Sequence, residues 1–447
     1  MRQLALDRTY AAPARMASEY IADPVRLAIV SIVVLALGYG ARFDNGSPFI
    51  IAALEPIVGN TFSLVEVALI ASGALELIRR MVIGDYWLER SPVSRYVIFV
   101  GVMCCAYPFL HMIANEGGVR APLELMYLPM FILTFFLYLF LFRREELPVM
   151  IWLVVIAGVY KSIEGIAVYM SVGISWGLLT GWRDGLLMAM MATGGLIALM
   201  IRADGDRTYA KIRNVLIWLL PLSTAIFIGC MRRSYMLGLA LALPVLIFML
   251  RGRERRIAII VTTIFVIGAT AVLLFIGLDF GDRVASSVSD PSKEGSSAYR
   301  LLEWYNVGMM ISERPWTGWQ MGINTINASG IQFESVSGLI PHNIYMYTML
   351  RGGILGLVAW CSMMFGTLFM NFRTVRAARR PLERFTALWL LSTTICLIAA
   401  GFTSPVITDR LQLFLAFPMV MASFLPGAWG KRGVTESNRG TVKANEA

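Results

Sequence analysis

The stretch SGLIPHNIYMYTMLRGGILGLVAW, residues 337–360, passes from a polar segment into an apolar run. Its apolar continuation reaches the length of about 20 residues that a helix needs to cross a bilayer. His342, one of only two histidines in the chain, stands at this transition. The stretch therefore predicts a membrane-spanning helix with a titratable side chain close to its first turn.

The rest of the chain repeats this apolar character. Of its 447 residues, 57% are hydrophobic and only 15% are charged, and the mean hydropathy is +0.67. No ordinary soluble domain could hide so much apolar surface. We expect an all-α polytopic membrane protein with about twelve transmembrane helices. The expected spans are residues 25–41, 61–78, 96–113, 123–142, 148–170, 184–201, 214–231, 235–250, 257–278, 352–371, 385–402 and 411–427.

The basic residues between these spans predict the orientation. Alternate connections are rich in arginine, such as RGRERR at 251–256 and RTVRAARRPLER at 373–384, and such connections are typically cytoplasmic. Both termini are then cytoplasmic, and the polar residues 1–24 form a tail because they lack a convincing signal-peptide cleavage site. The net charge of +10 is explained by this topology better than by a nucleic-acid surface.

The same topology divides the chain into four parts. Residues 279–341 are the one long loop and are expected on the exterior, periplasmic face. The segment at 49–59 is too short for a span and is expected to be interfacial or re-entrant. The parts are a membrane bundle of about nine spans at 1–278, the loop at 279–341, about three spans at 342–430, and a cytoplasmic tail at 431–447.

Common cofactor signatures are absent from the sequence. It contains no P-loop, no dinucleotide fingerprint and no metal-ligand spacing, so neither a cofactor nor a metal is expected. All five cysteines fall within expected spans, which predicts no disulfide framework.

The long loop contains one helical pattern. YRLLEWYNVGMMI, residues 299–311, has apolar residues at helical spacing and predicts an amphipathic helix on the outer membrane face. RPWTGWQMG, residues 314–322, follows as a turn, and its two tryptophans suit the bilayer interface.

Three basic sites fall on the face where the charge rule expects few. Arg232 and Arg233 lie between two spans, and they could be an anchoring pair that reaches the interface or a binding site. Arg300 could be an ordinary solvated charge. His342 could cap a helix or lie at the interface; alternatively, the helix N-terminus would favour its neutral imidazole, which can accept a proton.

Other ionisable residues lie inside expected spans. Lys161 and Glu164 are three residues apart, so a neutralising pair is the simplest account, with a proton or ion path as the alternative. Glu66 and Glu76 are expected to face the bundle interior. His111 is expected to pack or hydrogen-bond within the bundle.

In its order of motifs the chain resembles the O-antigen ligase and polysaccharide polymerase superfamily. The resemblance rests on MRRSYMLGLAL, on the loop arginine of YRLLEWYNVGMMISERPWTGWQMG with its Pro-x-x-Gly turn, and on PHNIYMYTMLRGGILGL. It covers about residues 230 to 360 and the overall topology. Gln320 and Arg351 depart from the family pattern.

Membership would imply a membrane glycosyltransferase of the GT-C type in the bacterial inner membrane. It would move a glycan from a polyprenyl (undecaprenyl) diphosphate to an acceptor hydroxyl on a glycan or a lipid-anchored sugar. The resemblance assigns Arg233 and Arg300, with Arg232, to the diphosphate, and His342 to the acceptor as base or orienting group. Guanidinium forks suit phosphate oxygens, so this inverting transfer is expected to need no metal.

Three alternatives remain open from the sequence. A polysaccharide polymerase of the same superfamily would share the donor and differ in the acceptor, and a protein-glycosylating transferase would differ in the same way. A transporter of lipid-linked glycans would use the exterior arginines as a gate, but the duplicated halves typical of many transporters are not evident.

Overall fold

A computed structural model of the chain describes residues 24–39, 64–83, 92–114, 124, 127–172, 185–229, 233–275, 295–323, 341–378, 380–403 and 411–425. Within these ranges the fold is entirely helical, as the composition predicts. The expected interfacial segment at 49–59 and the two tails lie outside the described residues.

Fourteen α-helices and two short segments of other helix types make up the described fold, and an apolar sequence accounts for most of them. The α-helices are α3 (Pro24–Tyr39), α4 (Leu64–Ile83), α5 (Pro92–Gly101), α6 (Tyr107–Ala114), α8 (Leu128–Leu141), α9 (Leu147–Val172), α11 (Gly185–Met200), α12 (Arg207–Gly229), α13 (Arg233–Met249), α14 (Gly252–Phe275), α16 (Gly295–Glu313), α17 (Ile344–Ala377), α18 (Pro381–Ala400) and α19 (Leu411–Phe424). The others are the π-helical segment η2 (Val102–Ala106) and the 3-10 turn η3 (Arg144–Glu146).

Several of these helices can cross a membrane. Among the described residues, five helical segments are long and apolar enough: Pro92–Ala114, Arg144–Ala167, Arg207–Gly229, Ile344–Ala377 and Pro381–Ala400. Five shorter apolar helices accompany them, and each of the twelve expected ranges overlaps a described helix. The chain is thus a helical membrane protein, while the count of twelve spans and their orientation stay predictions.

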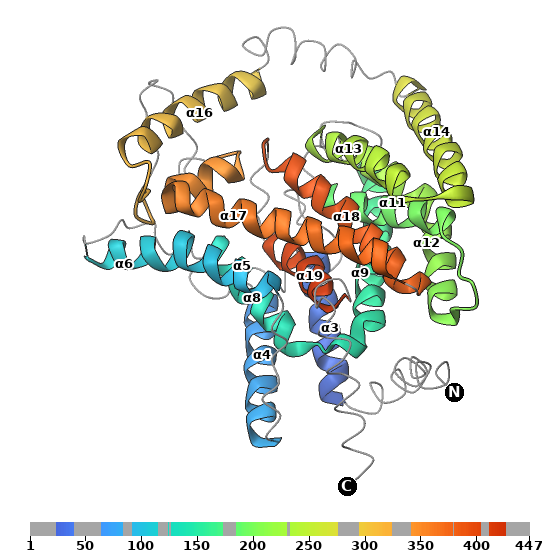
Figure 1. Ribbon diagram of the computed structural model, residues 1–447, viewed down its shortest axis with the longest axis horizontal. Helices are drawn as coiled ribbons and strands as arrows, with labels where there is room; N and C mark the ends of the chain where they lie inside the picture. Colours follow the sequence, from blue (N-terminus) through green and yellow to red (C-terminus); the bar gives the residue numbers. More distant parts are fainter. Residues whose placement is uncertain are drawn as a thin grey trace.

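Helix α17 runs across the middle of the bundle (Figure 1). It packs against α18 on one side and against α5 and η2 on another. Small residues permit the second contact, because a Cβ on Gly352 would lie 2.7 Å from the Met103 carbonyl oxygen, and one on Gly356 would lie 2.9 Å from Cys104 Sγ. Such close approaches at glycine are typical of helix packing in membranes.

Helix α17 extends beyond the expected span at both ends. The expected span begins at residue 352, whereas α17 begins at Ile344 and contains 34 residues, about 50 Å at 1.5 Å per residue. The helix is interrupted at Gly353, where φ is 61° and ψ is −158°. The expected span therefore begins at this interruption, and the turns before it match the helix start expected beside His342.

Helix α16 confirms the helix expected within the long loop. Leu301, Tyr305 and Met309 of its expected apolar face are exposed, as they would be against a bilayer, although that contact stays a prediction. The opposite face is buried against α17, through Val307 and Met310.

Two further expectations on the described residues are confirmed. Lys161 and Glu164 form a buried ion pair in α9, with 2.7 Å between Nζ and Oε2, as a neutralising pair requires. The four described cysteines, Cys104, Cys105, Cys361 and Cys396, form no disulfide.

Candidate functional site

The first turn of α17 is anchored at three points. Asn343 is its N-cap, and Asn343 Oδ1 accepts hydrogen bonds from the backbone N–H groups of Tyr345 at 3.0 Å and Met346 at 3.1 Å. The Ile344 N–H donates to the Gly401 carbonyl at 3.0 Å, and the Tyr345 hydroxyl donates to the Ile398 carbonyl at 2.8 Å. Asn343 thus fills the capping role considered for His342, and the end of α18 holds the helix start in place.

His342 lies one residue before the cap and contacts Glu303 of α16. Its Nδ1 is 3.1 Å from Glu303 Oε1, and its backbone N–H donates to Glu303 Oε2 at 2.8 Å. The Glu303 side chain is 1% exposed, whereas the His342 side chain is 35% exposed. One carboxylate therefore fixes both the backbone and the ring of a histidine that solvent or a substrate can still reach.

This contact determines which ring nitrogen can act as a base. With Glu303 as a carboxylate, its oxygens only accept hydrogen bonds, and this contact assigns the ring proton to Nδ1. In the neutral ring the lone pair then lies on Nε2, and Glu303 would stabilise the imidazolium formed when Nε2 takes a proton. A carboxylate, a histidine and a hydroxyl cooperate in this way in serine hydrolases.

Glu303 is the site residue that sequence reasoning missed. It lies three residues after Arg300 on α16, and residues at this spacing share a helix face. The Arg300 side chain, in the second turn of α16, is partly buried. An acidic residue one turn from a candidate arginine was a usable signal for Glu303.

The arginine pair is less completely placed. Arg232 lies outside the described residues, and Arg233 is the first residue of α13, so the position of either side chain near His342 stays a prediction. The helices do converge: a Cβ on Gly238 of α13 would lie 2.6 Å from the Cys396 Cα of α18. The last turns of α18 therefore contact both the start of α17 and the second turn of α13.

The second histidine does not join this site among the described contacts. His111 is near the end of α6, where its ring stacks on Tyr107 with 6.1 Å between centroids. This contact lies within α6, so packing of His111 inside the bundle stays a prediction.

The fold and the site together define a class of protein. It is a helical membrane protein in which a histidine beside a helix start, hydrogen-bonded to a buried carboxylate, is suited to proton transfer. A family model described as O-antigen ligase matches residues 218–361, from α12 into α17. This match confirms the resemblance drawn from the sequence and supports membership of the O-antigen ligase superfamily. No curated protein matches the chain in sequence.

The matched segment contains every candidate site residue. Arg232, Arg233, Arg300, Glu303 and His342 all fall within 218–361. At the level of the family, the match supports a membrane glycosyltransferase of the O-antigen ligase type.

Proposed function

We propose that this chain is an inverting, metal-independent glycosyltransferase at the periplasmic face of the bacterial inner membrane. It transfers a glycan from a polyprenyl diphosphate to an acceptor hydroxyl, as an O-antigen ligase does, and the acceptor is a lipid-anchored sugar. The observation that supports this proposal most strongly is the His342–Glu303 pair inside the matched segment.

The proposed reaction is a single displacement. His342 Nε2 takes the acceptor's hydroxyl proton while the hydroxyl oxygen attacks the anomeric carbon. The bond from that carbon to the diphosphate oxygen breaks, and the polyprenyl diphosphate leaves with the electron pair. Glu303 stabilises the imidazolium, and attack opposite to the leaving group inverts the anomeric configuration.

The leaving group is the second requirement. Arg300 and Arg233, with Arg232, are proposed to stabilise the diphosphate, because guanidinium groups offer paired donors to phosphate oxygens. This arrangement would supply the charge stabilisation that a metal ion supplies in other transferases.

A reconstituted reaction tests this function. Purified protein in detergent is incubated with a polyprenyl-diphosphate glycan and a lipid-anchored sugar acceptor, with and without a metal chelator. The proposal predicts one product, formed at the same rate in both conditions. A ladder of products would indicate a polymerase instead, and loss of activity with chelator would contradict metal independence.

Arg300 offers a second test of the donor site. Arg300→Ala is expected to remove most of the activity, and Arg300→Lys to restore little of it, because an ammonium lacks the planar fork. Arg255→Ala, which changes an exposed arginine of α14 away from the loop, is the control and should retain activity. Full activity in Arg300→Ala would remove this residue from the proposed site.

A further inference from the structure

The interruption of α17 is filled by the loop that follows α16. In an unbroken helix the Ile354 N–H would donate to the Leu350 carbonyl. Here the Ile354 N–H donates to the Pro315 carbonyl at 2.8 Å, and the Leu350 carbonyl accepts from the Trp319 N–H at 2.7 Å. Residues 315–319 are thus inserted where one helical hydrogen bond is missing, and both of its groups are satisfied.

Two glycines make the insertion possible. At Gly353, whose φ is 61°, a Cβ would clash with the Trp316 carbonyl oxygen. At Gly318, whose φ is 70°, a Cβ would lie 2.7 Å from the Arg351 carbonyl oxygen. The turn PWTG, residues 315–318, therefore packs directly against the helix segment RGG, residues 351–353, although the two are far apart in the sequence.

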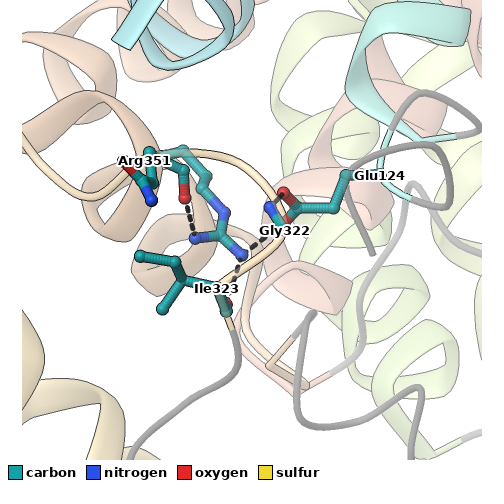
Figure 2. A network of polar contacts seen from close by, with 5 residues as sticks. Glu124, Gly322, Ile323 and Arg351 are labelled. Carbon is teal, nitrogen blue, oxygen red and sulfur yellow. Dashed lines mark hydrogen bonds and ion pairs between the residues drawn. The ribbon is translucent and has the colours of Figure 1, made fainter. Parts of the chain in front are cut away.

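A buried ion pair secures the rest of the loop (Figure 2). Arg351 Nη1 donates to the Gln320 carbonyl at 2.8 Å, and Nη2 donates to the Ile323 carbonyl at 3.1 Å. Nη2 also pairs with Glu124 Oε1, and Glu124 Oε2 accepts from the Gly322 N–H at 2.5 Å. Both charged side chains are fully buried, so the loop carbonyls depend on the guanidinium rather than on water.

This loop connects directly to the candidate site. It follows α16, which carries Glu303, and it is secured to α17, whose first residue lies two positions after His342. The Trp319 indole N–H donates to the Met310 carbonyl at 2.8 Å and so ties the loop back to α16. The loop therefore links α16 to α17 at a second place, and this link helps to fix the distance between Glu303 and His342.

We propose that Arg351 and Glu124 are positioning residues, which keep the His342–Glu303 pair in register by securing loop 315–323 in the interruption of α17. Neither residue needs to touch a substrate. Glu124 precedes α8 and lies outside the matched segment, so the first half of the chain takes part in shaping the site. This inference rests on the proposed function for its effect on rate, but its structural part stands independently.

The test removes the ion pair without leaving a buried charge. Replacing a buried pair by apolar side chains of similar size is often tolerated by the fold, so the variant is Glu124→Met with Arg351→Met. It leaves the Gln320 and Ile323 carbonyls without the guanidinium. The matched control is Lys161→Met with Glu164→Met, which removes a second buried ion pair of the described residues, in α9.

Two measurements are made on each full-length protein in detergent. The first is the transfer rate, separated into kcat and KM. The second is the distance between spin labels on p-acetylphenylalanine at positions 305 and 355, which are exposed on α16 and α17. We expect kcat to fall about 100-fold, the effect of roughly 1 Å of misplacement, with KM for the donor nearly unchanged and a broader distance distribution.

Other outcomes would contradict the proposal or require a second variant. An unchanged distance distribution together with a kcat within twofold of the parent would overturn it. An equal loss of kcat in the matched control would show that the Arg351–Glu124 pair contributes only to the general stability of the protein. Should the double variant fail to fold, Arg351→Lys keeps a charge opposite Glu124 but lacks the fork, and it must show the same broadening. A parent protein without transfer activity would refute the proposed function, while the distance measurement would still decide on the positioning role.

Discussion

At the scale of single residues, the partner of His342 matters as much as the histidine itself. A lone histidine beside a helix N-terminus can be interfacial, structural or catalytic. The Glu303 carboxylate favours the catalytic role, because as an acceptor for Nδ1–H it assigns the lone pair of the neutral ring to Nε2. The buried carboxylate is thus the feature that turns a plausible residue into a candidate base.

The role of Glu303 can be tested by removing its charge. Glu303→Gln retains one oxygen that can accept from Nδ1, but it loses the second acceptor for the His342 N–H and no longer stabilises the imidazolium, so we expect kcat to fall by roughly 10²- to 10⁴-fold with little change in KM. Glu313→Gln, on an exposed residue at the end of the same helix, should leave kcat within about twofold. A rate in Glu303→Gln equal to that of the parent would show that the carboxylate has only a structural role.

At the scale of elements, the site depends on helices that end or break at defined residues. Asn343 caps the start of α17, and Gly353 interrupts the helix nearly three turns later, where the loop after α16 enters. The conformation at Gly353 is accessible essentially to glycine alone. The interruption is therefore encoded locally by one residue and stabilised by a distant segment.

This dependence predicts the effect of a single methyl group. Gly353→Ala should lower thermal stability in detergent and reduce activity, because its Cβ would collide with the Trp316 carbonyl and the required φ costs an alanine about 1–3 kcal/mol. Gly308→Ala in α16 is the control, since its Cβ would meet no atom within 4 Å and alanine favours a helix. A Gly353→Ala protein as stable as the Gly308→Ala protein would contradict the described break.

The elements also show what the sequence could and could not predict. Apolar runs and arginine clusters were sufficient to locate twelve ranges that overlap described helices, because bilayer length constrains each run separately. The interruption at Gly353 could not be foreseen, since it requires residues 315–319 from a separate part of the chain. Glu124 was hidden for the same reason, and the expected span at 123–142 even included it, although α8 begins at Leu128.

At the scale of the whole molecule, the proposed chemistry requires one orientation. The arginine-rich connections predict that residues 279–341 lie outside and both termini inside. A donor presented on the periplasmic face can reach His342 only if this orientation holds. Topology is therefore a condition of the function and can be measured without any substrate.

Labelling with an impermeant thiol reagent on intact spheroplasts tests the orientation. A cysteine introduced at Ser296 should be labelled from outside, and one introduced at Arg255 should be labelled only after the membrane is opened. The parent chain with its native cysteines gives the background. The reverse pattern would place the candidate site in the cytoplasm and refute the proposed function.

The most direct measurement of the central claim is the transfer rate of the His342→Gln variant. Glutamine can orient an acceptor by hydrogen bonding but cannot act as a base near neutral pH, so a catalytic role for the imidazole predicts a loss of about two to four orders of magnitude in kcat with donor binding nearly unchanged. His342→Ala should show a comparable loss. Near-normal turnover in His342→Gln would show that the side chain only orients the acceptor, and near-normal turnover in both variants would contradict the account.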